Sequence, residues 1–190
     1  MTLKYVDNRD GKEYNLVRIG CQLWFAENLR YYIEDSSYMY NDRYSSFEKN
    51  GYLYSKDALD ELCPPGCHIP SAADFAKLYK SLETSANAMS WVEMLAGRHL
   101  ERNLSLQFGG FGSESQMDFW EEGLGAYFWT STEGKNKDRQ FCVIDAKGVS
   151  FRYPAPLRDL FSVRLVCNEV LTTRSNFAYL KRATSNEGPF

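Results

Sequence analysis

The order of strand and helix patterns along this chain excludes most fold classes. Residues 13–19 and 23–25 are short apolar runs separated by Gly20, as in two strands joined by a turn. Regular helical spacing of apolar residues occurs in the middle of the sequence, and strand patterns return after residue 103. Because strands and helices do not alternate, the order predicts an α+β fold with an antiparallel β-sheet.

Two main helices are predicted in that middle region. The first begins at Ser71, which has the spacing of a capping box with Asp74, and apolar residues follow at helical intervals to Leu82. The second is predicted over residues 87–100. Its inward-facing residues are expected to be Trp91, Met94 and Leu95.

The remaining segments predict long irregular loops and short strands. Residues 31–54 are rich in Tyr, Ser and Asn without periodicity, so we expect an ordered loop there, followed by a brief helix over residues 55–62 that two prolines end. The glycines of residues 108–112 exclude a helix. Later strands are predicted over residues 126–132, 139–144, 149–153 and 161–167, with a hairpin connection at 145–148.

Composition and charge limit the kinds of partner that the chain can bind. The net charge of −3 excludes the concentrated positive field that nucleic-acid binding requires. The sequence has no apolar stretch long enough to span a bilayer and no signal peptide at residues 1–8. We therefore expect a single domain that folds in the cytoplasm without an export signal. Aromatic residues make up 15% of the chain, which suits both a β-rich core and a contact surface.

The cysteines favour a reducing compartment. There are five of them, so at least one thiol has no partner within the chain, and they are widely spaced. This pattern is not that of a disulfide-stapled scaffold. The cysteines are Cys21, Cys63, Cys67, Cys142 and Cys167.

The chain contains a series of short motifs in a characteristic order. They are DGKEY at 10–14, IG at 19–20, WFAENL at 24–29, GYLY at 51–54, CPPGCHIPS at 63–71, GGF at 109–111, YFWTSTE at 127–133 and FSVR at 161–164. This order resembles the Fibrobacter succinogenes major paralogous domain over about residues 5–168. The family is similar to C-type lectins, to formylglycine-generating-enzyme-like domains and to the variable proteins of diversity-generating retroelements. The resemblance implies a C-type-lectin-like domain over residues 1–168 and a C-terminal extension over residues 169–190.

The chain departs from the family pattern at its cysteines. Family members usually carry a cysteine pair in the Tyr-rich loop, where this chain has Tyr38 or Tyr40 and Phe47. They usually have tryptophan at the position of Cys67 and cysteine at the position of Leu165. The resemblance therefore implies that the family disulfides lack partners here, in keeping with a chain that is not exported.

No catalytic or metal site is predicted. His68 follows Cys67, but adjacent residues seldom point at each other and no third group orients the pair, so a Cys–His nucleophile is rejected. Cys63, Cys67 and His68 are too few for a structural zinc. Among cofactors, only calcium remains open, because some lectin-like domains use it. Its candidate ligands are Asp118, Glu121 and Glu122, although a solvated acidic loop explains them better.

Ligand binding is the function that the residues favour. In this fold class the binding face is commonly built from late strands and loops, and here those segments combine aromatic residues with arginine, as binding hot spots do. Alternation along the strands assigns Trp129 and Phe141 to the core. The predicted ligand-binding residues are Trp120, Tyr127, Arg139, Arg152, Tyr153 and Arg158.

The sequence thus predicts a non-catalytic binding or display module that recognises a cell-surface glycan or protein. A bacteriophage virion protein would reconcile the absent signal peptide, the missing cysteine pairs and the adhesive fold. Such a protein folds in the cytoplasm and acts on the virion or extracellular surface, with residues 170–190 contacting other subunits. Three alternatives stay open: a secreted bacterial adhesin whose signal was removed, a structural subunit whose aromatic face binds other subunits, and an oxidase of the formylglycine-generating type.

Overall fold

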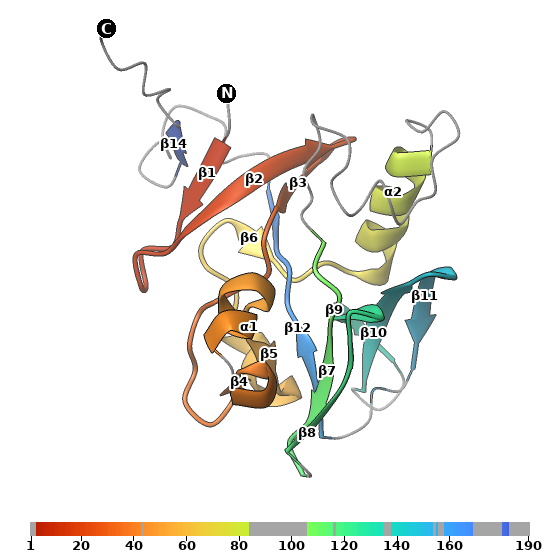
Figure 1. The fold of residues 1–190 in the computed structure, drawn as a ribbon. Helices are drawn as coiled ribbons and strands as arrows, with labels where there is room; N and C mark the ends of the chain where they lie inside the picture. Colours follow the sequence, from red (N-terminus) through yellow and green to blue (C-terminus); the bar gives the residue numbers. More distant parts are fainter. Residues whose placement is uncertain are drawn as a thin grey trace, which may run out of the picture.

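The computed structural model describes residues 3–42, 44–83, 106–115, 117–134, 138–153, 155, 158–168 and 180–182 (Figure 1). Within these residues the strands form two sheets in which most neighbours are antiparallel. The smaller sheet has the order β14-β1-β2-β3-β13-β6. Its strands are β1 (Leu3–Val6), β2 (Glu13–Ile19), β3 (Gln22–Phe25), β6 (Cys67–His68), β13 (Val166–Cys167) and β14 (Leu180–Arg182).

The larger sheet has the order β11-β10-β9-β7-β12-β5-β4, and β8 pairs with β7. Parallel bridges join β9 to β7 and to β12, and the other pairings in this sheet are antiparallel. Its strands are β4 (Ser37–Tyr38), β5 (Leu53–Tyr54), β7 (Gly109–Ser113), β8 (Asp118–Glu122), β9 (Gly125–Glu133), β10 (Arg139–Asp145), β11 (Gly148–Arg152) and β12 (Asp159–Ser162). The predicted α+β fold with antiparallel sheets is confirmed.

The β10–β11 hairpin forms where the sequence predicts it. Asp145 lies opposite Gly148 at the end of the ladder, and Gly148 takes a φ of 127°. A positive φ is readily adopted only by glycine, so the turn residue fixes the register of both strands.

Helix α2 (Ala72–Glu83) begins with the predicted capping box. The Asp74 amide donates to Ser71 Oγ at 3.2 Å, and the Ser71 amide donates to Asp74 Oδ2 at 3.0 Å. Burial alone would raise the pKa of Asp74, but the hydrogen bonds that its carboxylate accepts from the Ser71 hydroxyl and amide, with Lys77 and His68 nearby, hold it below its usual value. The N-terminal end of α2 is therefore determined by local sequence.

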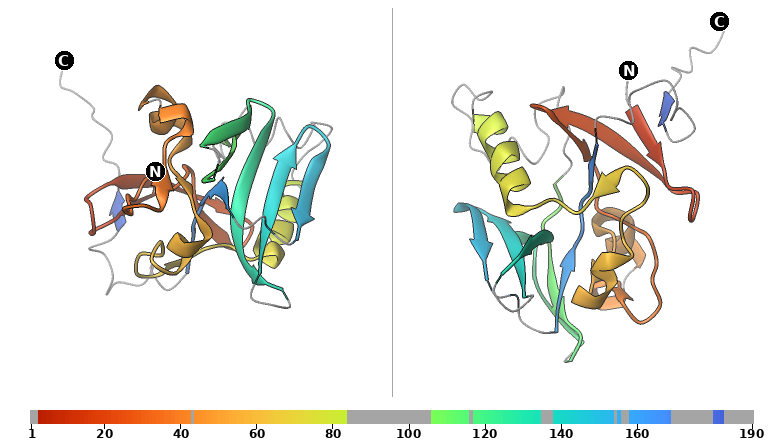
Figure 2. Two further views of the ribbon diagram at one scale, coloured as in Figure 1. Left: turned by 90° about the horizontal axis from the view of Figure 1, so that it is seen from below. Right: turned by 180° about the vertical axis from the view of Figure 1, so that it is seen from behind.

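The apolar face of α2 covers the larger sheet, and Figure 2 shows the helix lying along β10 and β11. Phe75 packs on Phe128 of β9, with ring centroids 5.8 Å apart, and on Trp24 of β3, at 5.2 Å. A second core cluster lies on the other face of β9 and β10, where Trp129 and Phe141 are buried as predicted. Both clusters contain residues of both sheets, so the two sheets pack against shared cores.

Two elements predicted before α2 differ from the structure. Residues 31–54 are not one irregular loop, because they contain the short helix α1 (Tyr44–Asn50), the 3-10 turn η1 (Tyr40–Asp42) and two strands. The helix predicted over residues 55–62 is the shorter 3-10 helix η2 (Lys56–Asp60), and Ser55 precedes it without a side-chain capping bond. The helix predicted over residues 87–100 lies outside the described residues.

The predicted last strand, residues 161–167, is divided into β12 and β13. Between them the chain crosses from the larger sheet to the smaller one, and residues 25 and 29 donate backbone hydrogen bonds to Leu165 and Val163. Buried Arg164 donates to Asn28 Oδ1 through Nε at 3.0 Å and through its NH2 nitrogen at 2.6 Å. Desolvation lowers the pKa of Arg164 to about 10. These contacts hold residues 163–165 out of either ladder.

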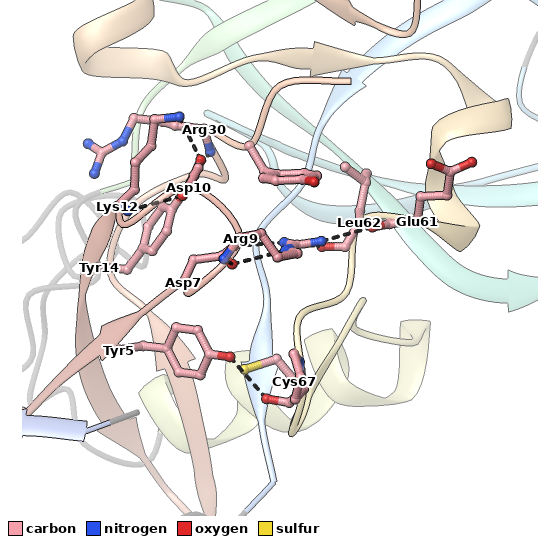
Figure 3. A network of polar contacts seen from close by, with 12 residues as sticks. Tyr5, Asp7, Arg9, Asp10, Lys12, Tyr14, Arg30, Glu61, Leu62 and Cys67 are labelled. Carbon is pink, nitrogen blue, oxygen red and sulfur yellow. Dashed lines mark hydrogen bonds and ion pairs between the residues drawn. The ribbon is translucent and has the colours of Figure 1, made fainter. Parts of the chain in front are cut away.

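The turn between β1 and β2 is tied to the end of η2 (Figure 3). Arg9 pairs with Asp7 at 2.7 Å and donates to the carbonyl oxygens of Glu61 and Leu62 at 2.9 and 3.1 Å. Below it, the Tyr5 hydroxyl donates to the Pro65 carbonyl at 3.0 Å. None of the helices in the described part of the chain has the length and apolar character needed to cross a membrane.

Candidate ligand-binding groove

An open groove of about 560 Å³ lies between the β7–β8 hairpin and β12. We call it the β7–β8 groove. The hairpin register places Phe111 opposite Trp120, and β12 joins β7 with Asp159 opposite Ser113. Three strands from two distant parts of the sequence therefore build one surface. Its lining residues are Phe111, Ser113, Trp120, Glu121 and Asp159.

Aromatic rings form one wall of the β7–β8 groove. The rings of Phe111 and Trp120 lie 5.4 Å apart at 36°, and Phe111 also contacts the Tyr127 ring at 4.7 Å. Trp120 is 37% exposed, whereas Tyr127 is 5% exposed. An indole supported by half-buried Phe111 and open to solvent is held in place for stacking on a ligand.

Two carboxylates line the same groove. Glu121 accepts a hydrogen bond from the Tyr127 hydroxyl, and burial together with this contact raises the pKa of Tyr127 well above its usual value. Asp159 is half-buried, and its burial raises its pKa. The hydroxyl of Ser113 lies 3.1 Å from that of Ser115. The groove thus offers several hydrogen-bond acceptors beside an aromatic plane.

The hairpin that carries Trp120 depends on a close approach at Gly110. Its φ is 67°, and a Cβ atom there would lie 2.0 Å from the Trp120 carbonyl oxygen and 2.8 Å from the Glu122 amide nitrogen. Only glycine fits such a position. Gly110 of the GGF motif therefore allows the backbone of β8 to lie against β7.

The charge of the groove lining restricts the ligands that it suits. Among the described residues that line it, the two ionisable ones are acidic and there is no lysine or arginine. Carboxylates accept hydrogen bonds from hydroxyl groups, and an aromatic face packs against the C–H groups of a sugar ring. A neutral polyhydroxyl ligand or a cationic one fits this chemistry, whereas an anionic ligand does not.

Of the six predicted binding residues, Trp120 lines this groove, and Arg158 and Tyr127 each neighbour a residue that does. The Arg158 carbonyl accepts a hydrogen bond from the Glu114 amide at 2.8 Å beside Asp159. Tyr127 was expected at the surface, and this is wrong. It is buried under Phe111 because its ring completes the aromatic stack, and it reaches the groove through Glu121.

The other three predicted residues lie elsewhere on the larger sheet. Arg139 is occupied by an ion pair with Glu133 at 3.1 Å and a longer one with Asp60 at 3.6 Å, in a separate charged hollow. Arg152 is exposed on the outer strand β11, opposite Phe141, and its charge acts on Tyr127, whose pKa it lowers against the larger effect of burial. Tyr153, 44% exposed, follows β11, and its hydroxyl lies 3.5 Å from Asp138 Oδ2.

The predicted set of ligand-binding residues did not include four of the residues that line the groove, although Glu121 was considered as a calcium ligand. Phe111, Ser113 and Glu121 belong to a hairpin whose partner residues depend on register, and Asp159 joins them only through the pairing of β12 with β7. The available signal was the alternation of Phe111 with Gly110 and Gly112, which indicates a strand with one large side chain on one face and none on the other. No local pattern identifies Asp159.

Cys67 and His68, which the sequence analysis rejected as a Cys–His nucleophile, each lie near another residue. Cys67 lies against Cys167, with the sulfur atoms 2.8 Å apart, and not against His68. His68 Nε2 is 3.7 Å from Asp74 Oδ2, to which Ser71 Oγ donates at 2.7 Å. Because the serine hydroxyl donates to the carboxylate, this group is a helix cap and not a nucleophile with its base. Among the described residues, no three His, Cys, Asp or Glu residues are grouped to hold a metal ion.

Comparison with known proteins gives one match. The family model described as the Fibrobacter succinogenes major domain matches residues 17–167. No curated protein and no solved structure matches the chain. The matched segment runs from β2 to β13 and includes every residue that lines the β7–β8 groove. Since it covers well over half of the 190 residues, the chain belongs to the Fibrobacter succinogenes major domain family.

Proposed function

We propose that this chain is a non-catalytic recognition module with a C-type-lectin-like fold, and that its β7–β8 groove binds a sugar ring of a cell-surface glycan. The observation that carries the proposal is the exposed Trp120 ring, supported by Phe111 and flanked by the carboxylates of Glu121 and Asp159. A volume of about 560 Å³ is within the range of small-ligand sites, which is about 300–1,000 Å³.

The acidic lining favours neutral glycans over sialylated or phosphorylated ones. A carboxylate on the ligand would meet Glu121 or Asp159 with like charge, whereas paired hydroxyl groups would donate to them. A protein partner is the other class of ligand that the aromatic residues suit. For a protein, however, the groove would need to bind a basic side chain, because the ionisable residues of its described lining are both acidic.

A glycan-array screen of the full-length chain tests the proposal. We expect neutral hexose-containing glycans to bind and sialylated versions of the same glycans to bind less. Calorimetry of a positive glycan should then show that Trp120→Ala weakens binding at least about tenfold, as loss of a hot-spot tryptophan does. The matched control is Leu124→Ala, which removes a 70% exposed side chain just beyond β8 that does not line the groove.

Three outcomes would contradict the proposal. Trp120→Ala could bind as the wild type does, which would exclude the groove. Leu124→Ala could weaken binding equally, which would indicate a general effect of the hairpin. Sialylated glycans could bind best, which would place the ligand elsewhere on the surface, for example at exposed Arg152.

A cell-surface glycan is met outside the cell, so the proposal places the working protein on a virion or another extracellular surface. Immunogold labelling of purified virions and of intact cells checks this location. Label found only after cell lysis would contradict it and would favour a structural or intracellular role.

A further inference from the structure

Two cysteines that are 100 positions apart lie face to face in the smaller sheet. Cys67 on β6 is the direct cross-strand partner of Cys167 on β13, and their sulfur atoms are 2.8 Å apart. The exposed fractions of the two residues are 8% and 3%. Neither thiol belongs to the β7–β8 groove, and neither is used by the proposed function.

The backbone geometry suits a covalent bond between them. The Asn168 amide donates to the Gly66 carbonyl at 2.8 Å, so the ladder hydrogen bond lies beside the cysteine pair and not within it. In an antiparallel ladder such a non-hydrogen-bonded pair has its Cα atoms about 4.5 Å apart, with the side chains closest together. That separation is within the range of disulfides, about 4.4–6.8 Å.

The surroundings favour this pair over any other. Cys21 and Cys63 are exposed, and Cys142 lies on β10 opposite Phe128 and Phe151. Both paired thiols belong to the core cluster that contains Tyr5, and Figure 3 shows the Tyr5 ring beside Cys67. The hydrogen bond with Cys167, and then burial, raise the pKa of Cys67, so oxidation without a catalyst is expected to be slow.

We propose that Cys67 and Cys167 form an oxidisable pair, converted to a cross-strand disulfide by a low-molecular-weight disulfide such as oxidised glutathione. One cysteine thiolate attacks the glutathione disulfide and releases one glutathione thiol. The second cysteine thiolate then attacks the mixed disulfide and releases the other. Two cysteine thiols are thus oxidised to one disulfide, and one glutathione disulfide is reduced to two thiols.

The bond would link the strand that precedes α2 to the last strand of the matched domain. Closing so long a segment of chain removes conformational freedom from the unfolded state. For a chain of this size we expect the melting temperature to rise by roughly 5–15 °C on oxidation. The protein would then be stabilised on passing from a reducing compartment to an oxidising one.

The test uses the full-length chain with Cys21→Ser and Cys63→Ser, which removes both exposed thiols. Removing Cys63 also matters because trypsin leaves it in the same peptide as Cys67, residues 57–77. After equilibration with oxidised glutathione at pH 8, we expect the intact mass to fall by two hydrogens and one thiol per chain to remain alkylatable after denaturation. Non-reducing digestion should link peptide 57–77 to peptide 165–174, and dithiothreitol should reverse both the link and the gain in melting temperature.

The control adds Cys142→Ala to this double variant, and it should oxidise in the same way. Three alkylatable thiols in the double variant after equilibration would overturn the proposal. So would a glutathione adduct at Cys67 without a cross-link, or a link that includes Cys142. Because these readouts are masses and thiol counts, they are independent of whether the β7–β8 groove binds a glycan.

Discussion

Asp159 shows how a single residue of the groove can oppose stability and favour binding. Burial raises its pKa, so the folded state holds the Asp159 proton more tightly than the unfolded chain does. As the pH rises above the unfolded value of about 3.9, ionisation therefore lowers the free energy of unfolding. Residues with this balance are common at functional sites.

We accordingly expect Asp159→Asn to raise the melting temperature at pH 7, where the wild-type carboxylate is ionised at a cost. The difference should disappear at about pH 3, where the carboxyl is protonated in both states. Differential scanning calorimetry at pH 3, 5 and 7 checks this, with Asp118→Asn on the exposed end of β8 as the control. The same variant should bind the glycan more weakly. A lower melting temperature at pH 7 would contradict the account of the carboxylate.

The residue scale is also where sequence reasoning was least complete. Strand alternation, which is a local property, assigned Trp129 to the core, where it is buried. The burial of Tyr127 was missed because it depends on the β7–β8 hairpin folding over β9 and placing Phe111 on its ring. Likewise, the ion pairs of Arg139 come from residues that are distant in sequence or across a turn, so its charge alone was not informative.

Among the elements, the β7–β8 hairpin is the one whose backbone most directly determines the site. Gly110 and Gly123 both have a positive φ, but a Cβ atom at Gly110 would meet backbone atoms, whereas one at Gly123 would have no atom within 4 Å. An alanine at position 123 would therefore carry only the conformational strain of a positive φ. An alanine at position 110 would carry the same strain and would also clash with backbone atoms.

We expect Gly123→Ala to lower the free energy of unfolding by about 1 kcal/mol, the cost of the left-handed conformation. Gly110→Ala should cost roughly 3–5 kcal/mol, because β8 must also move away from β7. Urea unfolding followed by tryptophan fluorescence measures both. Equal losses in the two variants would show that the approach of β8 to Gly110 does not determine the hairpin.

Elements defined by local signals were predicted well, and elements defined by tertiary contacts were not. The capping box of Ser71 and Asp74 determines where α2 begins, and Gly148 determines the β10–β11 turn, whatever the rest of the fold does. By contrast, the division of residues 161–167 into two strands depends on Arg164 reaching Asn28, 136 positions away. No periodicity in the sequence encodes that contact.

At the scale of the whole molecule, the two sheets are joined by shared core clusters and by the chain crossing at residues 163–165. The smaller sheet carries a further strand, because β14 from the predicted extension pairs with β1 and aligns Leu180 with Tyr5. Figure 1 shows β14 next to β1, at the edge of this sheet. The described part of the extension thus covers a sheet edge of its own chain.

This pairing leads to a definite expectation for a chain that ends at Asn168. Without β14, the outer edge of β1 loses its ladder partner, and an unpaired edge tends to pair with another molecule. The truncated chain should therefore self-associate more than the full-length chain, and its β1 amides should exchange with deuterium faster. Light scattering after size exclusion and hydrogen exchange measure these effects. Lys181→Pro, which removes one amide donor from β14 at unchanged chain length, should act in the same direction but less strongly. Defined oligomers of the full-length chain, together with a monomeric truncated chain, would instead make residues 169–190 a contact to other subunits.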